Sequence, residues 1–397
     1  MNKQELTVKG FSFAALSAGL KKEGKLDLGL IFSDVPANSA GVFTTNKVVA
    51  APVVLTAPRV RGGLCQAILV NSKNANACTG KQGMLDAGRC SMEMAAVLDI
   101  DETLVAVSST GVIGQRLPVD KITAAMPQLV SGLDPGNAEA VAEAMMTTDS
   151  FSKVSAAYGS FKESPYTILG LAKGAGMIHP NMATMLGFVV TDAKIAPELL
   201  DTMLKQAVES SFNRITVDRD TSTNDMVLLL ANGASDAEIE ADSSEAVTFS
   251  ELLAEVLLDL AKMIVRDGEG ATKLVKVEVI GAASAGDALL AAESVATSSL
   301  VKTALFGEDA NWGRIIAAVG YSGAEIDPDR VDIRVGDILL AEDGLATSAE
   351  QEEAATAIMK QPEFTVTVDL KSGDGSAYYY TSDLTYDYVK INADYRT

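Results

Sequence analysis

The chain is 397 residues long, 48% hydrophobic and 21% charged, so it can bury a large core, and its length predicts two or three structural units. Its net charge of -21 gives a surface that repels phosphate backbones, which excludes nucleic acid as an expected partner. No apolar run approaches the roughly 18 residues that a membrane helix needs, so we expect no membrane partner either.

The cysteines and the N-terminal region indicate a reducing compartment. Cys65, Cys78 and Cys90 are too few and too irregularly spaced for a disulfide framework or a paired zinc site. Residues 10–20 are apolar but are interrupted by glycine and serine, and no convincing signal-cleavage site follows them. We therefore expect a cytoplasmic protein.

Strands and helices alternate along the chain without a regular repeat. Four short apolar runs have the length and β-branched content of strands, namely residues 67–70, 104–107, 166–171 and 185–190. Two longer segments have helical periodicity: apolar residues recur from Ile195 to Phe212, and again from Leu252 to Ile264. Thr248 and Glu251 have the spacing of a capping box before the second helix, and Asp267-Gly268 is a natural end for it.

The last third of the chain predicts two more helices and then strands. Residues 287–303 are alanine-rich and predict one helix, and residues 312–319 predict another. Residues 364–370 alternate in polarity, a Ser-Gly-Asp-Gly turn follows, and residues 376–381 return, which predicts a hairpin. We expect residues 384–391 to add a third strand. Because no βαβ repeat is present, helices packed on a mixed sheet or a pair of sheets are favoured over a doubly wound nucleotide-binding fold.

The histidine count limits the chemistry, because His179 is the chain's single histidine. A multi-histidine metal site is excluded, and any triad would have to use this residue. We expect His179 to be structural, since nothing in the sequence identifies an orienting partner. The cysteines likewise have the neighbours of core or loop residues, with nothing to lower a thiol pKa.

The segment that contains His179 is unusual, because a glycine-rich loop from Lys173 leads through a proline to Ala183, Thr184 and an apolar strand. The ordinary alternative is a strand-loop-strand connection in which the threonine is buried or caps a turn. A threonine at the start of a buried strand is also placed to attack the preceding carbonyl. Its new α-amine, with a reference pKa of about 7.7 to 8.0, would then be able to take the hydroxyl proton without a histidine.

Ordered blocks over essentially the whole chain resemble the ornithine acetyltransferase family, also called the bifunctional glutamate N-acetyltransferase and amino-acid acetyltransferase, in which an Ala-Thr bond cuts itself. The blocks are residues 40–46, 71–80, 109–114, 173–192, 212–225, 267–273, 311–314 and 392–397. The chain departs from the family pattern at three positions: Lys73 and Arg219 stand where we expect glycine, and Ala310 where we expect proline.

The resemblance implies a fold and a processing event. The fold is α/β, a layered α-β-β-α sandwich of the self-cleaving N-terminal-threonine type (ornithine acetyltransferase or DmpA-like). Cleavage between Ala183 and Thr184 would give an alpha chain, residues 1–183, and a beta chain, residues 184–397. The two products are expected to stay together as a heterotetramer with two copies of each.

The resemblance also implies the site residues. Thr184 is the nucleophile, and Thr110 with Gly111 forms the oxyanion hole. Substrate is bound by Thr147, Lys173, Thr184, Glu269, Asn392 and Thr397. The chemistry of these side chains is suitable, because a cation can hold a carboxylate and a carboxylate can hold the amine of ornithine. In isolation, Thr110-Gly111 is typical of a plain turn, Thr147 of a cap, Lys173 of a solvated cation, and the glycines beside Glu269 of a loop without P-loop spacing.

The implied activity is a step of arginine biosynthesis. Acetyl would pass from N-acetylornithine to Thr184 and then to glutamate by a ping-pong route, with no cofactor and no metal. Whether acetyl-CoA is a second donor stays open. Two alternatives also stay open at this point: a self-cleaving peptide hydrolase of the same fold, and a non-enzymatic protein in which Thr184 is merely a strand residue.

Overall fold

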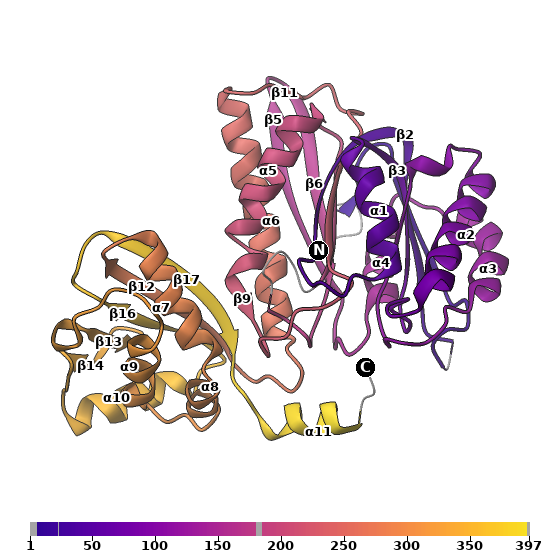
Figure 1. The fold of residues 1–397 in the computed structure, drawn as a ribbon. Coiled ribbons are helices and arrows are strands. Elements are labelled where there is room, and N and C mark those ends of the chain that lie inside the picture. Colours follow the sequence, from indigo (N-terminus) through magenta and orange to yellow (C-terminus); the bar gives the residue numbers. More distant parts are fainter. Residues whose placement is uncertain (1–5, 23, 180–184, 395–397) are drawn as a thin grey trace.

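The structure, a computed structural model, describes residues 6–22, 24–179 and 185–394. They form two unequal units, each built on its own sheet, with a last helix that leads from the smaller unit back towards the larger one (Figure 1). In these residues no single helix is both long and apolar enough to cross a membrane. One bent helix pair, residues 285–306, passes that test by length and composition alone.

The larger unit is built on an eight-stranded sheet in the order β4-β3-β2-β10-β7-β6-β5, with β1 paired to β2. Its strands are β1 (Phe11–Leu16), β2 (Leu28–Phe43), β3 (Leu64–Asn71), β4 (Val105–Ser109), β5 (Lys153–Phe161), β6 (Ser164–Lys173), β7 (Leu186–Thr191) and β10 (Met226–Ala231). The long strand β2 joins two halves of this sheet. Its first part pairs with β1 and β3, its last part pairs with β10, and the register against β3 shifts between Phe32 and Ala37.

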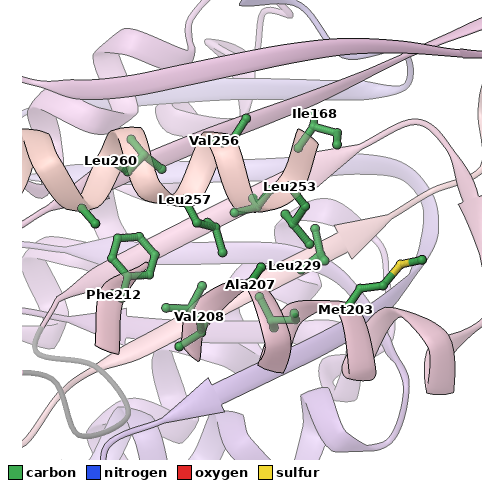
Figure 2. Packing of buried hydrophobic residues seen from close by; sticks show 14 of the residues in the cluster. Ile168, Met203, Ala207, Val208, Phe212, Leu229, Leu253, Val256, Leu257 and Leu260 are labelled. Carbon is green, nitrogen blue, oxygen red and sulfur yellow. The ribbon is translucent and has the colours of Figure 1, made fainter. Parts of the chain in front are cut away.

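The two halves face each other across a shared core and carry helices on their outer faces. Helices α5 (Pro197–Glu209) and α6 (Ser244–Arg266) cover the half with β10, β7 and β6, where Leu257 and Val208 pack against Ile168 and Leu229 (Figure 2). Helices α2 (Gly80–Leu98) and α3 (Val119–Ser131) cover the other half. The inner core contains residues of both halves and of α1 (Ala51–Arg61) and α4 (Ala138–Met145). The predicted α-β-β-α layering is therefore confirmed.

The four strands predicted in this unit all form, as β3, β4, β6 and β7. The first predicted helix is α5, although Ile195 lies just before it in β8 (Lys194–Ile195), which pairs with β11 (Glu238–Ile239), and Phe212 lies after it in a short 3-10 turn, η3 (Phe212–Arg214). The second is α6, which ends at Arg266 as predicted. Its predicted start was wrong, because the hydroxyl of Ser243 accepts the backbone N–H of Ala246 and begins the helix one turn earlier.

The smaller unit is a seven-stranded sheet in the order β15-β14-β13-β16-β12-β17-β9, with helices on one face. Its strands are β9 (Ile215–Thr216), β12 (Leu274–Ala282), β13 (Asp332–Val335), β14 (Ile338–Glu342), β15 (Leu345–Ala346), β16 (Glu363–Asp369) and β17 (Gly375–Ser382). The helices are α7 (Ala285–Thr297), α8 (Ser299–Phe306), α9 (Trp312–Gly320) and α10 (Ala349–Met359). A short 3-10 turn, η4 (Pro328–Arg330), lies before β13, and a similar turn, η2 (Glu102–Leu104), lies before β4 in the larger unit. The last helix is α11 (Tyr386–Asp394).

Three predictions for this region were wrong. Strands β16 and β17 form, but they do not pair as a hairpin: β12 lies between them, parallel to β16 and antiparallel to β17. The predicted single helix over residues 287–303 is broken at Ser298, whose hydroxyl caps α8, so α7 and α8 meet at 58°. The predicted third strand is helix α11, where Thr385 accepts the backbone N–H of Tyr388. The prediction of α9 is confirmed.

Candidate active site

A cavity of about 220 Å³ lies where the ends of β4, β6 and β7 meet the loop after α6 and helix α11. Six of the predicted site residues line it: Thr110, Gly111, Thr147, Lys173, Glu269 and Asn392. Ala183, Thr184 and Thr397 lie outside the described residues. Met185, which follows Thr184 directly, lines the same cavity, so six residues from separate parts of the chain gather beside the predicted cleavage position.

The Thr110-Gly111 loop requires glycine at its second position. Gly111 has φ +132°, and a Cβ there would lie 2.2 Å from the carbonyl carbon of Lys73. The backbone N–H of Thr110 already donates to the carbonyl of Asn71 at 3.0 Å. The donors that this loop can offer to the cavity are therefore the hydroxyl of Thr110 and the backbone N–H of Gly111.

Lys173 ends β6 within a buried network of charges. Its Nζ donates to Thr147 Oγ1 at 2.9 Å and lies 3.7 Å from Asp149 Oδ2. Asp149 also forms an ion pair with Lys153, whose Nζ lies 2.8 Å from Asp149 Oδ1. The same Nζ lies 2.5 Å from Asp267 Oδ2. Burial alone would raise the pKa of Asp149, but the charges of Lys173 and Lys153 outweigh it and hold the pKa well below its usual range. Lys173 is thus a fixed cation that keeps a free side towards the cavity, rather than a solvated surface lysine.

Glu269 supplies the opposite charge in the lining of the cavity. Its backbone N–H donates to the carbonyl of Ala175 at 2.8 Å, and its carboxylate accepts from Asn392 Nδ2 at 2.8 Å. Gly176 is needed beside it, because a Cβ on this glycine would lie 2.4 Å from the carboxyl carbon. Asn392 reaches this carboxylate from α11, so the last helix contributes to the lining of the cavity.

Four carboxylates in or beside the cavity were missed by the sequence analysis: Asp149, Asp218, Asp220 and Asp225. Asp218 accepts the backbone N–H groups of Met177 and Ile178 at 2.6 and 2.7 Å and the hydroxyl of Tyr388 at 3.4 Å. It therefore anchors the chain that runs towards the predicted cleavage position. Asp149 lies two residues after Thr147, and the other three carboxylates lie in the block 212–225, so proximity to these residues was the one available signal.

The departures from the family pattern have a local explanation. Lys73 and Arg219, where glycine was expected, have φ values of +76° and +67°, a region that glycine enters without strain. Ala310, where proline was expected, is 3% exposed and sits just before α9. At Lys73 and Arg219 the backbone thus has the left-handed conformation that glycine favours.

His179 and the cysteines lie away from the described lining of the cavity. His179 Nε2 is 3.4 Å from a carboxylate oxygen of Glu293 on α7, and its carbonyl accepts from the hydroxyl of Thr221. Burial raises the pKa of Cys65 and of Cys90 to about 12, and Cys78 is exposed. Among the described residues, no group of three or more histidines, cysteines or carboxylates is placed to hold a metal ion.

Comparison with known proteins agrees with this geometry. The sequence profile of the ArgJ family matches residues 12–397. An arginine biosynthesis bifunctional protein ArgJ of Syntrophotalea carbinolica is 65% identical over 391 residues, with 98% of this chain and 99% of the relative covered. The corresponding protein of Geobacter sulfurreducens is 54% identical over 393 residues, with 99% of this chain and 100% of the relative covered.

Two solved structures match parts of the chain. A crystal structure of the arginine biosynthesis bifunctional protein ArgJ of Bacillus halodurans is 44% identical, with a TM-score of 0.51, and the match covers 52% of this chain and 98% of that chain. The ornithine acetyltransferase of Mycobacterium tuberculosis, solved in complex with ornithine, is 37% identical, with a TM-score of 0.41, and the match covers 46% and 98% of the two chains. The resemblance found in the sequence is confirmed, and the chain belongs to the ArgJ family of arginine biosynthesis.

Proposed function

We propose that this protein cuts itself between Ala183 and Thr184 and then moves an acetyl group from N-acetylornithine to glutamate through an ester on Thr184. One observation carries the proposal. A single cavity beside Met185 brings together a buried cation at Lys173, a carboxylate at Glu269 and the donors of the Thr110-Gly111 loop. An acetylated amino acid needs these three features, namely a charge for its carboxylate, a charge for its free amine and donors for its acetyl oxygen.

The first half of the transfer forms the ester. Oγ of Thr184 attacks the acetyl carbonyl carbon and gives its proton to the α-amine of the same residue. The Thr110 hydroxyl and the Gly111 N–H stabilise the oxyanion of the tetrahedral intermediate. The C–N bond to ornithine then breaks, and the leaving nitrogen takes the proton from the α-ammonium.

The second half returns the hydroxyl. The amine of glutamate attacks the ester carbonyl and gives a proton to the α-amine of Thr184. The ester C–O bond breaks, Oγ takes that proton back, and N-acetylglutamate leaves. In this proposal Lys173, which is held by Thr147 and Asp149, binds the α-carboxylate that both amino acids share, and Glu269 binds the side-chain ammonium of ornithine.

The architecture favours products that stay together after the cut. Strand β7, from residues 184–397, pairs with β6 from residues 1–183, and β10 from the second piece pairs with β2 from the first. Separating the two pieces would thus open the centre of the eight-stranded sheet and its apolar core. The match with the Bacillus halodurans chain, which covers 98% of that chain but 52% of this one, is the length relation expected for one piece of a cut protein.

The proposal extends to a second donor, to the assembly and to the compartment. The curated relatives are named bifunctional, so we propose acetyl-CoA as an additional acetyl donor for glutamate. Release of free CoA thiol that depends on glutamate would support this use, and its absence would restrict the protein to acetylornithine. We also propose two copies of each piece, which predicts a native mass of about twice 41.4 kDa, and a cytoplasmic location, testable by cell fractionation.

The test combines intact mass with an exchange assay. The wild-type protein should give the two masses of residues 1–183 and 184–397, and it should release ornithine from N-acetylornithine in step with N-acetylglutamate formation. Thr184→Ala should remain one chain of 41.4 kDa and lose at least about 1000-fold in activity. Thr202→Ala, which removes an exposed threonine of α5, is the matched control and should be cut and active.

Two results would contradict the proposal. A Thr184→Ala chain that still separated into two pieces would place the nucleophile elsewhere. Acetate release from N-acetylornithine that did not require glutamate would identify a hydrolase instead of a transferase.

A further inference from the structure

We propose that Lys153 is a positioning residue that sets the distance between the two substrate-binding charges, and thereby makes the site selective for the length of the diamino-acid side chain. Lys153 forms ion pairs with Asp149, which holds Lys173, and with Asp267. Asp267 lies two residues before Glu269. The inference rests on the proposed function, in which Lys173 binds the α-carboxylate of N-acetylornithine and Glu269 binds its side-chain ammonium. Lys153 is outside the described lining of the cavity, so it acts through these neighbours.

The ammonium of Lys153 is buried, and each of its three N–H groups has an acceptor. The residue is 0% exposed and is the first residue of β5. Its Nζ lies 2.8 Å from Asp149 Oδ1 and 2.5 Å from Asp267 Oδ2. It also donates to the carbonyl of Phe151 at 3.3 Å. Because a lysine has three donors, the position of this ammonium is fixed by acceptors from two distant parts of the chain.

Asp149 connects Lys153 to the part of the cavity that contains Lys173. Its Oδ1 also accepts the backbone N–H of Gly174 at 2.6 Å. Its Oδ2 accepts the backbone N–H of Thr147 at 2.9 Å and lies 3.7 Å from Lys173 Nζ. The pairing of β5 with β6 places Lys153 beside the end of β6 that carries Lys173. One carboxylate thus holds both the side chain and the backbone at the end of β6.

Asp267 connects the same ammonium to Glu269. It caps the end of α6, and its carboxylate accepts both the backbone N–H and the hydroxyl of Ser150. Gly268 alone separates it from Glu269, whose backbone N–H donates to the carbonyl of Ala175 at 2.8 Å. The contacts and the chain between them close a ring that contains Lys173, Asp149, Lys153, Asp267, Glu269 and Ala175.

The ring suits the fixing of a distance better than the stabilisation of a fold. A carboxylate at the end of a helix meets the negative end of the helix dipole, so Asp267 is unfavourable there without a cation such as Lys153. Buried ion pairs often add little stability compared with apolar side chains of similar volume, and their best-attested use is to specify one arrangement. Here the specified arrangement is that of Lys173 relative to Glu269.

A fixed distance between a cation and a carboxylate selects a ligand by its length. One extra methylene lengthens the side chain of the substrate by one C–C bond of about 1.5 Å. A displacement of about 1 Å at a reacting centre is enough to cost about 100-fold in rate. Without the Lys153 ammonium, the segments that carry Lys173 and Glu269 lose their buried connection, so a longer substrate should be rejected less strongly.

The test is Lys153→Met, which keeps an unbranched side chain and removes the ammonium. Lys371→Met is the matched control, because Lys371 also pairs with two carboxylates, Asp332 at 2.6 Å and Asp343 at 2.8 Å. Lys371 belongs to the smaller unit and is outside the described lining of the cavity. For the wild type and both variants we would measure cleavage by intact mass, the thermal unfolding midpoint, and kcat and KM for N-acetylornithine and for Nα-acetyllysine, which is one methylene longer.

The expected result is a loss of discrimination between the two substrates. The wild-type protein should prefer N-acetylornithine by roughly 10- to 200-fold in kcat/KM, the usual range for one methylene. In Lys153→Met the KM for N-acetylornithine should rise by about 10-fold, and the preference should fall by at least about 5-fold. A purely structural defect would lower kcat/KM for both substrates in the same proportion. Lys153→Met should still be cut, and Lys371→Met should keep the wild-type preference.

Four outcomes would overturn the inference: a wild-type protein without this preference, a Lys153→Met protein that keeps it, a Lys153→Met chain that stays uncut, or a Lys371→Met protein that loses the preference to the same degree. If Lys153→Met does not fold, Asp267→Asn replaces it with the same expectations, because it keeps the pair of Lys153 with Asp149 and removes the charge next to Glu269. A failure of the proposed function is recognised separately, because the wild-type protein would then lack Thr184-dependent cleavage or glutamate-dependent transfer from N-acetylornithine.

Discussion

The two walls of the cavity are built in different ways. Thr110, Gly111, Thr147 and Lys173 come from the eight-stranded sheet and its loops, where buried hydrogen bonds and ion pairs fix them. Asn392 comes from α11, a helix that buries none of its residues and leads from the smaller unit towards the larger one (Figure 1). The comparison teaches that one cavity combines residues held by buried hydrogen bonds and ion pairs with a residue carried by a helix that adds nothing to the core.

The largest effect is expected when the buried charges lose a partner. Asp149→Asn leaves Lys173 without its carboxylate and weakens the hold on Lys153, so we expect a loss of about 3 to 5 kcal/mol in the free energy of unfolding, measured by urea denaturation. The depressed pKa of Asp149 means that its contribution is present above the unfolded pKa and is lost as pH falls through the folded pKa.

The matched control for this change is Asp201→Asn, which breaks the exposed pair with Lys205 on α5. Exposed pairs contribute little, so we expect a loss of about 0.5 kcal/mol or less. Equal losses in the two variants would contradict the view that the sheet-side wall depends on buried charge.

A second effect, on catalysis rather than stability, is expected at the oxyanion loop. A Cβ in Gly111→Ala would collide with the backbone of Lys73 and move the loop, so kcat for acetyl transfer should fall by about 100- to 1000-fold. Gly88→Ala on α2, where a Cβ meets nothing within 4 Å, should leave kcat unchanged. A wild-type kcat in Gly111→Ala would contradict the prediction, because it would show that the Thr110-Gly111 loop can move without a loss of catalysis.

A smaller effect is expected on the α11 wall. Asn392→Ala removes the donor to Glu269, so KM for N-acetylornithine should rise by about 10-fold while kcat changes little. The thermal midpoint should stay within about 2 °C, because α11 buries none of its residues. Lys390→Ala, an exposed change on the same helix, is the control, and a loss of fold stability in Asn392→Ala would contradict the contrast between the walls.

The smallest effect is a pH dependence in the smaller unit. Lys302, on α8, is buried against the end of β17, where its Nζ donates to Thr381 and Ser382. Burial lowers the pKa of Lys302 to about 7. The unfolded chain keeps this proton until pH nears 10.5, so between pH 7 and 10.5 the unfolded state binds more protons and stability rises with pH. Lys302→Met should reduce this slope by no more than about 1.4 kcal/mol per pH unit. Urea denaturation at pH 7.5 and 9.5 measures it, and the exposed change Lys360→Met should leave the slope unaltered.

Much of the larger unit was predictable because its elements are locally consistent. Residues 67–70, 166–171 and 185–190 are apolar runs of strand length, and each forms a strand because each is buried on both faces of the sheet. The candidate site was predictable only through the family resemblance. Periodicity alone does not indicate that Thr110, Lys173 and Glu269 share a cavity, since they lie far apart in the chain.

The wrong strand pairing has a tertiary cause. Residues 364–370 and 376–381 have hairpin character, but the buried valines of β12 pair with both strands, and no local signal distinguishes that arrangement from a hairpin. The partners of Asp149 were hidden for the same reason, because Asp267 lies on a distant part of the chain, beyond α6.

The sequence by itself determined the mixed α/β class, several of the buried strands, the end of α6 and, through the family resemblance, the layering and the residues expected to carry the chemistry. These features depend on local periodicity, capping and residue type, which can be assessed from the sequence without knowledge of the tertiary contacts. Only the tertiary structure decided the strand order in the smaller unit and the buried ion pairs behind Lys173. Each of these depends on which distant groups share a buried volume, and burial determines whether a charge is paired, shifted in pKa or left for a partner.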